Sequence, residues 1–389
     1  MNAPAKRRDW SSLLAFGIFW IVVAVGCLIA YQLVNALGLP GARSTAAARA
    51  PKHLHRVRPS GNPPRFTVAS IFAPKPVSLA RYQKHKLRTI IATGDVIPGR
   101  SVNYKMVTYN DFLYPFRRTA GYLRNADLTL INLESPLISG CLLTDSGMSF
   151  CGDPRATQGF TYAGIDVACT ANNHIGNYGS PGIQETWQHL TAAGIAHCGL
   201  GAIAYKSVRG LRFAFLAYNA VGQRFDYTLA RQEIHEARKH AAVVIVSVHW
   251  GKEYVPVPSI APGIADDDPV RIAHWIIDSG ADLIIGNHPH HVQGVEMYHG
   301  HLITYAHGNF AFDQMFTVSD CPGDANRYCS TREGVVGKYT FYGRKLVSVR
   351  YKPLVIYDYA QPRWADPAVG RAILSEMKRS TRELARTGR

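Results

Sequence analysis

Residues 281–314 read ADLIIGNHPHHVQGVEMYHGHLITYAHGNFAFDQ, and this stretch decides how the chain folds. Its two short apolar runs, residues 283–285 and 302–305, are typical of buried strands. Polar, nitrogen-bearing residues follow each run, with GNHPHH at 286–291 and HGNF at 307–310. Two strands that end in such residues predict a site at one edge of an α/β sheet.

The first of these two segments contains a pair of histidines, His288 and His290, separated by Pro289. In an extended chain, side chains two residues apart face the same way. Two converging imidazoles at a strand end suit a divalent metal ion. A histidine-rich surface loop is the alternative, and this stretch alone leaves both interpretations open.

The rest of the chain repeats the strand pattern, with apolar runs at residues 89–92, 128–133, 167–170, 213–217 and 243–248. Helical patterns fall between several runs, at residues 181–193, 230–240 and 269–279. This alternation predicts an α/β domain with largely parallel pairing. Residues 335–342 and 346–351 predict an antiparallel hairpin around Gly343. We place the domain at 87–360, followed by a basic helix or tail at 361–389.

The N-terminal part of the sequence predicts a membrane anchor. Lys6, Arg7 and Arg8 precede a long uncharged stretch, and its apolar centre at residues 13–31 is long enough to cross a bilayer. The basic cluster should stay in the cytoplasm. We therefore expect a single-pass membrane protein, with a cytoplasmic tip and anchor at 1–37 and an extracytoplasmic globular domain. A cleaved signal peptide is the alternative.

Residues 38–86 are rich in proline and basic residues and predict a tether that holds the domain off the membrane. An inert linker is the alternative. The whole chain has a formal charge of +16 and a pI of about 9.6. Such a charge fits an anionic membrane surface or an acidic polymer. Nucleic acid is not an expected partner, because the sequence has no zinc-finger, RNA-binding or helix-turn-helix signature.

Six of the seven cysteines lie in the body of the chain and form no C-x-x-C pattern. In an exported domain an even number of cysteines predicts disulfides. We expect Cys141–Cys151 and Cys321–Cys329, each around a short polar loop, and Cys169–Cys198 by elimination. Buried free thiols are the alternative.

Chemically useful residues follow five of the apolar runs. Asp95 and Glu134 offer carboxylates, and Asn173 offers an amide oxygen. Three imidazoles come from His249, His288 and His290. Such a mixed set suits one or two divalent ions of Mn, Fe or Zn.

Two further residues could serve a substrate. His174 directly follows the expected ligand Asn173 and is the candidate to protonate a leaving group. Arg100 could pair with an anionic substrate group through its guanidinium.

With these motifs, residues 87–358 resemble the capsule-synthesis CapA family, membrane-anchored proteins linked to bacterial poly-γ-glutamate capsule production. The resemblance rests on the following motifs: Gly94-Asp95 with Gly99-Arg100, Asn132-Leu133-Glu134, Ala171-Asn172-Asn173-His174, His249-Trp250-Gly251 with Glu253-Tyr254, His288-Pro289-His290 with Gln293, and Gly308-Asn309-Phe310. That family is similar to the calcineurin-like metallophosphatases. The similarity implies a four-layer α/β/β/α sandwich behind the N-terminal transmembrane helix.

The metallophosphatase pattern also implies roles for single positions. Asp95 matches its first metal-binding aspartate, and Glu134 stands where it has a bridging aspartate. Its Asn-His pair corresponds to Asn173 and His174, and its later ligand histidines correspond to His249, His288 and His290.

This sequence departs from that pattern at three places. Ile97 occupies a position where a ligand histidine is usual, Asn177 replaces an aspartate, and Ala306-His307 replaces Ser-Leu. With the ligand at position 97 missing, we expect one tightly held ion and one that is loose or absent.

These observations favour a membrane-anchored protein that assembles, exports or modifies an anionic capsular polymer of the poly-γ-glutamate type. Its site would be a metal-assisted hydrolase or transferase centre. Expected partners are the polymer, the membrane and other capsule-synthesis membrane proteins. Two alternatives stay open, a general metallophosphoesterase and a non-catalytic scaffold that binds polyanions.

Overall fold

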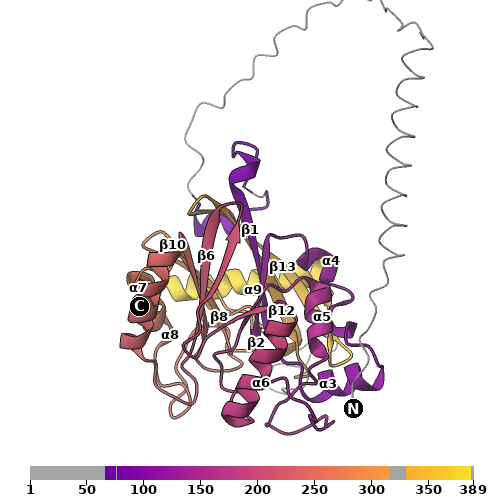
Figure 1. Ribbon diagram of the computed structural model, residues 1–389. Coiled ribbons are helices and arrows are strands. Elements are labelled where there is room, and N and C mark those ends of the chain that lie inside the picture. Colours follow the sequence, from indigo (N-terminus) through magenta and orange to yellow (C-terminus); the bar gives the residue numbers. More distant parts are fainter. Residues whose placement is uncertain (1–65, 76, 315–329, 387–389) are drawn as a thin grey trace, which may run out of the picture. The chain divides into compact units, whose positions relative to one another are not determined.

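Two β-sheets form the centre of the fold (Figure 1). The computed structural model describes residues 66–75, 77–314 and 330–386. The first sheet has the strand order β14-β13-β12-β1-β2-β3-β4, and β11 also pairs with β1. The second sheet has the order β5-β6-β7-β8-β10-β9. The predicted α/β class is therefore confirmed.

The first sheet combines a parallel half with an antiparallel half. Its parallel strands are β1 (Leu87–Val96), β2 (Leu128–Leu133), β3 (Val167–Cys169), β4 (Ala196–Cys198) and β11 (Asn309–Ala311). Its antiparallel strands are β12 (Glu333–Tyr342), β13 (Lys345–Tyr357) and β14 (Gln361–Trp364). The β12–β13 hairpin turns at Gly343, which has a φ of 57°. This is the hairpin that the alternating sequence predicts.

The second sheet is parallel at its centre and antiparallel at both edges. The parallel strands are β6 (Leu211–Asn219), β7 (Val243–His249), β8 (Leu283–Asn287) and β10 (His301–Thr304). The edge strands are β5 (Ala204–Val208) and β9 (Val295–Tyr298). The opening stretch of sequence thus supplies three of the six strands.

Helices cover the outer faces of both sheets (Figure 1). On the first sheet lie α3 (Arg100–Thr108), α4 (Ala120–Leu123), α5 (Ala156–Ala163) and α6 (Gly179–Ala192), with the short η2 (Tyr114–Phe116). On the second lie α7 (Tyr227–His240) and α8 (Pro269–Asp278). Asp226 and Asp268 cap α7 and α8, because each side chain accepts a backbone hydrogen bond from the first turn.

Successive side chains along each strand face different layers of the fold. In β1, Ile90 and Ala92 point into the core between the two sheets, whereas Ile91 packs against the helices outside. In β7, Ile245 faces the core between the sheets and Val246 faces α7 and α8. This period of two follows from the pleat of a strand. The layers run helix, sheet, sheet, helix.

The C-terminal helix α9 (Pro367–Arg386) belongs to the same folded unit. It contacts β13 of the first sheet and β9 of the second, and its Ile373 and Met377 enter the core between the sheets. The short α2 (Val68–Ile71) also packs against this core, whereas η1 (Lys84–Lys86) leads into β1 and η4 (Ser330–Arg332) into β12.

The predicted anchor at residues 13–31 lies outside the described residues, as does most of the tether. Among the helices that the structure describes, none is both long enough and apolar enough to span a membrane.

The six cysteines have three different outcomes. Cys141 and Cys151 form the predicted disulfide, with their Cα atoms 5.8 Å apart. Cys321 and Cys329 lie outside the described residues. The predicted Cys169–Cys198 bond is wrong for this structure, because both residues are free thiols with Sγ atoms 3.2 Å apart. They are register partners on β3 and β4, and the side chains of neighbouring parallel strands stand side by side rather than toward each other.

Candidate metal centre

The predicted site residues come together where strands of both sheets end. Asp95 lies one residue before the end of β1, and Glu134 directly follows β2. Asn173 and His174 follow β3. His249 ends β7, and His288 and His290 follow β8. Because parallel strands place their carboxyl ends at one edge of a sheet, residues distant in sequence meet here.

Two overlapping groups of three residues could each hold a metal ion. The first contains Glu134, His288 and His290, and the second contains Asp95, Glu134 and His249. Within each group one ligand atom per residue lies within 4.8 Å of the others, and every member is buried. Glu134 belongs to both groups. It therefore stands where a bridging ligand would stand if two ions were bound.

Asp95 and His290 are directly paired, with 3.1 Å between Asp95 Oδ2 and His290 Nδ1. Burial alone would raise the pKa of Asp95, but the hydrogen bond and charge of His290 outweigh it and hold that pKa below its usual range. Burial likewise lowers the pKa of His290, but Asp95 and Glu134 together raise it to about 9. The pair is thus an ionic contact in the absence of bound metal.

Several buried polar atoms at this centre lack a hydrogen-bond partner among the described residues. They are both ring nitrogens of His288 and the Oε1 atom of Glu134. His249 Nε2 lies 3.3 Å from that oxygen but donates its hydrogen bond to Asn173 Oδ1, at 2.9 Å. Burial lowers the pKa of His288 well below its ordinary value, which keeps its imidazole neutral.

Buried polar groups are nearly always hydrogen-bonded. A neutral imidazole and a carboxylate with free lone pairs are the protonation states that metal binding requires. The donor set at this centre therefore fits a divalent ion, and imidazole with carboxylate favours Mn, Fe or Zn over Ca.

The backbone of the His288-Pro289-His290 turn is unusual. His288 has a φ of 94° and His290 a φ of 50°, both in the left-handed region that non-glycine residues rarely occupy. The backbone N–H of His288 donates to Asp95 Oδ2 at 3.3 Å. Such conformations persist only where the surroundings enforce them, and they cluster at functional sites.

Three asparagines to which the sequence analysis assigned no role support these ligands, Asn132 and Asn309 by direct hydrogen bonds and Asn172 through Asn132. Asn132 Nδ2 donates to Asp95 Oδ1 at 2.8 Å and to Glu134 Oε2 at 3.4 Å. Asn172 Nδ2 donates to Asn132 Oδ1 at 3.1 Å, and Asn309 Oδ1 accepts a hydrogen bond from His290 Nδ1 at 2.9 Å. For Asn132 the sequence held a signal, because it lies two residues before Glu134, and in an extended chain such side chains face the same way.

His174 lies at the rim of the centre and is 9% exposed. Its ring stacks on Phe150 with 4.0 Å between centroids, and its Nδ1 lies 3.1 Å from Asn177 Oδ1. Burial lowers its pKa from the ordinary value. Asn177, where the metallophosphatase pattern expects an aspartate, therefore holds His174 in place.

The structure brings Arg100 close to this rim but pairs it within the protein. Its Nη2 lies 2.5 Å from Asp313 Oδ1, and its guanidinium packs against the rings of Phe150 and Phe312, 4.6 and 5.3 Å from their centroids. A third contact is the hydrogen bond from Nη1 to the carbonyl oxygen of Gly147, at 3.1 Å. Arg100 is thus paired within the protein, and its role in binding a substrate anion stays a prediction.

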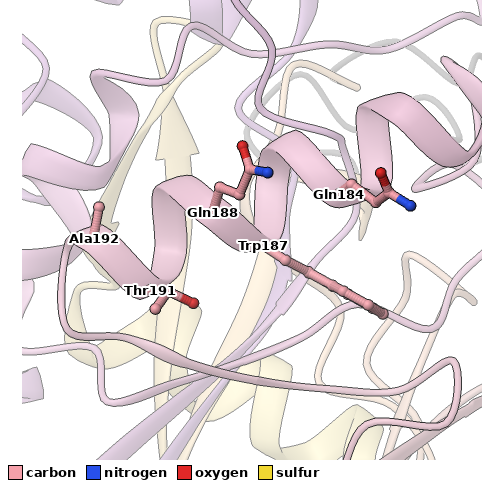
Figure 2. A pocket seen from close by; sticks show the side chains of 5 residues that line it. All are labelled: Gln184, Trp187, Gln188, Thr191 and Ala192. Carbon is pink, nitrogen blue, oxygen red and sulfur yellow. The ribbon is translucent and has the colours of Figure 1, made fainter.

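A surface hollow on α6 shares no residue with this centre (Figure 2). It is lined by Gln184, Trp187, Gln188, Thr191 and Ala192. Trp187 stacks on His197 at 4.6 Å and donates from Nε1 to Thr170 Oγ1 at 3.1 Å. None of these five lining residues carries a carboxylate or an imidazole, so this hollow is separate in chemistry from the strand-end cluster.

The sequence is similar to two Bacillus proteins that are named CapA. The Capsule biosynthesis protein CapA of Bacillus anthracis is 28% identical over 269 residues, which cover 62% of this chain and 64% of that protein. The PGA biosynthesis protein CapA of Bacillus subtilis (strain 168) is 29% identical over 247 residues, covering 58% of this chain and 63% of that protein. The chain thus spans slightly less than two thirds of the length of these relatives.

Among solved structures, a hypothetical protein from Thermus thermophilus aligns with a TM-score of 0.42 and 15% identity, over 68% of this chain and 98% of that chain. Residues 89–314, more than half of the 389 residues, match the family described as Bacterial capsule synthesis protein PGA_cap. This range contains every predicted metal ligand. The chain therefore belongs to the PGA_cap family of bacterial capsule synthesis proteins.

Proposed function

We propose that this protein acts in the synthesis or export of an anionic capsular polymer of the poly-γ-glutamate type, through a metal-dependent hydrolase or transferase site. The family and the names of the two Bacillus relatives support the pathway. The formal charge of +16 supports an anionic partner.

One observation carries the proposal of a metal site. Asp95, Glu134, His249, His288 and His290 come from different strands of two sheets, yet they meet in a buried cluster. Burying charged and polar groups without partners is costly. The unpartnered atoms of Glu134 and His288 are best explained by an ion that binds between them. The helix, sheet, sheet, helix layers fit a metallophosphatase-like sandwich with its metal at the sheet edge.

The residues of the centre have separate tasks in this proposal. A bound divalent ion would supply a Lewis acid that polarises a carbonyl or phosphoryl oxygen. Glu134, His288 and His290 would hold one ion and Asp95, Glu134 and His249 the other, with the amide oxygen of Asn173 as a further ligand. His174 at the rim would exchange a proton with the substrate, since it follows Asn173 directly and keeps 9% of its surface exposed.

We also propose that residues 13–31 anchor the chain and that the domain lies outside the cytoplasm, where it meets the polymer, the membrane and other capsule-synthesis membrane proteins. Lys6, Arg7 and Arg8 support this orientation. The Cys141–Cys151 disulfide supports it independently, because such bonds persist mainly in oxidising compartments.

The function can be tested in a strain that makes the polymer and carries this gene. Wild-type protein, His288→Ala and the surface control Glu236→Gln would replace the chromosomal copy, and surface polymer would be measured with protein level. We expect polymer to be lost only with His288→Ala. Full polymer with that variant would contradict the catalytic proposal and favour the scaffold. Rapid hydrolysis of p-nitrophenyl phosphate by the wild-type protein would instead favour a general phosphoesterase.

A further inference from the structure

Three basic side chains meet on the outer face of the first sheet. Lys338 on β12 is the register partner of Arg350 on β13, and Lys352 lies two residues beyond Arg350 and so on the same face. Val336, the register partner of Lys352, packs in the core between this sheet and its helices, which identifies the face as the outer one. Arg350 is exposed and both lysines are partly exposed. Like charges directly opposite each other destabilise a sheet, so sheet stability does not explain this arrangement.

Two aromatic rings border these cations. Lys352 Nζ lies 3.9 Å from the ring centroid of Trp364 on β14 and 4.4 Å from that of Tyr122 on α4. The two rings pack edge to face, with 5.1 Å between centroids. Lys338 Nζ lies 5.9 Å from the centroid of Tyr122. We call these five residues, Tyr122, Lys338, Arg350, Lys352 and Trp364, the basic patch.

None of the three cations forms an ion pair with a carboxylate among the described residues. Asp127 attracts Lys338, but Arg209 already holds that carboxylate, with Nη1 2.5 Å from Oδ1. Lys338 donates instead to the carbonyl oxygen of Asn125, at 2.8 Å. Burial lowers the pKa of Lys338 and that of Lys352 below the ordinary value. A nearby anion offsets such a cost of burial, because it favours the charged form of a lysine.

We infer that the basic patch binds a stretch of polycarboxylate chain; this rests on the anionic polymer of the function proposed above. Side chains two residues apart along a strand are separated by about 6.6 Å, and neighbouring strands by about 4.8 Å. The three cations can therefore meet separate carboxylates of one chain that carries a carboxylate on every repeat. Arg350 can bind one of them through two parallel hydrogen bonds. The two rings offer apolar surface to the methylene groups between the carboxylates.

The rings favour a polymer over a membrane as the ligand. A surface that binds a bilayer has apolar side chains that enter the boundary between headgroups and acyl chains. Tyr122 and Trp364 are only partly exposed, and they pack on each other. The basic patch thus has the charge for an anionic ligand without apolar side chains that project from it.

The basic patch lies apart from the metal centre, although both are on the first sheet. Ile91 on β1 is the register partner of Lys338, and it precedes Asp95 by four residues, or about 13 Å along the strand. No residue of the basic patch belongs to the two groups that could hold a metal ion. Substitutions in the patch therefore leave the metal ligands in place, and the two sites can be tested separately.

The test measures how fluorescein-labelled poly-γ-glutamate binds to the purified full-length protein, by fluorescence anisotropy at about 0.15 M NaCl. The patch variant is Lys338→Gln/Arg350→Gln/Lys352→Gln. A control variant removes the same charge from exposed positions on α9: Arg371→Gln, Lys378→Gln and Arg382→Gln. We expect the Kd to rise about fivefold or more in the patch variant, because a single exposed ion pair contributes up to about fivefold in affinity. The control should change the Kd by less than about twofold, since salt screens charges that do not touch the polymer.

The same Kd in the patch and control variants would overturn this inference and leave the proposed function standing. A wild-type protein that does not bind the polymer would overturn the polymer partner and this inference together. A patch variant that keeps polymer binding but loses binding to phosphatidylcholine–phosphatidylglycerol vesicles would assign the basic patch to a membrane surface instead.

Circular dichroism checks that the variants are folded. If the triple patch variant does not fold, Arg350→Gln carries the test, because this side chain is exposed. We expect it to raise the Kd by about twofold or more, and an unchanged Kd would contradict the inference.

Discussion

Removing the Cys141–Cys151 disulfide should lower stability by an amount that the loop length sets. The two cysteines are 10 residues apart. In the chain-entropy model, closing a loop of this length removes about 9 cal/mol/K from the unfolded state, or ~2.7 kcal/mol at 25 °C. With an unfolding entropy of ~2.1 cal/mol/K per residue over roughly 300 folded residues, the melting temperature should fall by about 4 °C.

The assay is thermal unfolding of the wild-type protein and of the double variant Cys141→Ala/Cys151→Ala, without reductant. Leu142→Ala is the control within the same loop, because Leu142 is 74% exposed and its loss should change the free energy of unfolding by less than about 0.5 kcal/mol. A double variant that melts within about 1 °C of wild type would refute the loop-closure argument.

The same loop should also matter for the site. Phe150, next to Cys151, stacks on His174, and its backbone N–H donates to Asn177 Oδ1 at 2.7 Å. We therefore expect the double variant to lose order at His174 as well as stability. Histidine NMR signals would report this change, and an unchanged His174 signal would show that the rim is held without the disulfide.

Three other substitutions follow from close packing and burial. Gly94→Ala should destabilise the protein by about 1–3 kcal/mol in urea unfolding, because a Cβ there would overlap the carbonyl group of Gly308. Gly121→Ala should be neutral or stabilising, since a Cβ at that helical position meets nothing within 4 Å in the described chain. Equal changes in the free energy of unfolding for Gly94→Ala and Gly121→Ala would contradict the packing argument. Burial lowers the pKa of His307 from 6.5 to about 4, so the unfolded chain binds its proton first as pH falls. The contribution of His307 to the free energy of unfolding should be complete above about pH 6.5 and fall by about 3 kcal/mol toward pH ~4. In His307→Gln, the slope of the free energy of unfolding against pH should decrease by the equivalent of up to one proton. An unchanged slope would exclude His307 as the cause.

The sequence predicted well that these residues lie close together, because each follows a recognisable strand and parallel strands end at a common edge. Asp95, Glu134 and His249 each follow an apolar run, and parallel strands always place such ends at one edge. The same reasoning applied to β8 placed His288 and His290 there. The class of fold followed from the same alternation of strands and helices.

Other features depend on contacts between distant residues and could not be predicted in this way. Arg100 pairs with Asp313, which is 213 residues away, so its role as a free substrate-binding cation could not be judged from its own motif. Cys169 and Cys198 do meet, as elimination suggested, but their positions on neighbouring strands leave them as thiols.

The state of the C-terminal segment also could not be predicted from its own sequence. Its sequence allowed either a helix or a frayed tail. Ser380 Oγ accepts from Gly294 N–H at 2.8 Å and Thr381 Oγ1 accepts from Val295 N–H at 3.0 Å. These contacts fix α9 against the segment that follows His288 and His290, and they exist only in the folded chain.

The most direct test of the central claim is the metal content of the purified full-length protein, measured by inductively coupled plasma mass spectrometry beside Glu134→Ala and His288→Ala. We predict that the wild-type protein retains one tightly held Mn, Fe or Zn ion, with a second that is loose or absent, because Ile97 supplies no ligand. Both variants should lose the tight ion and stay folded, since neighbouring groups cannot replace a missing ligand. Full metal content in both variants, or a wild-type protein that takes up none of these metals, would contradict the account.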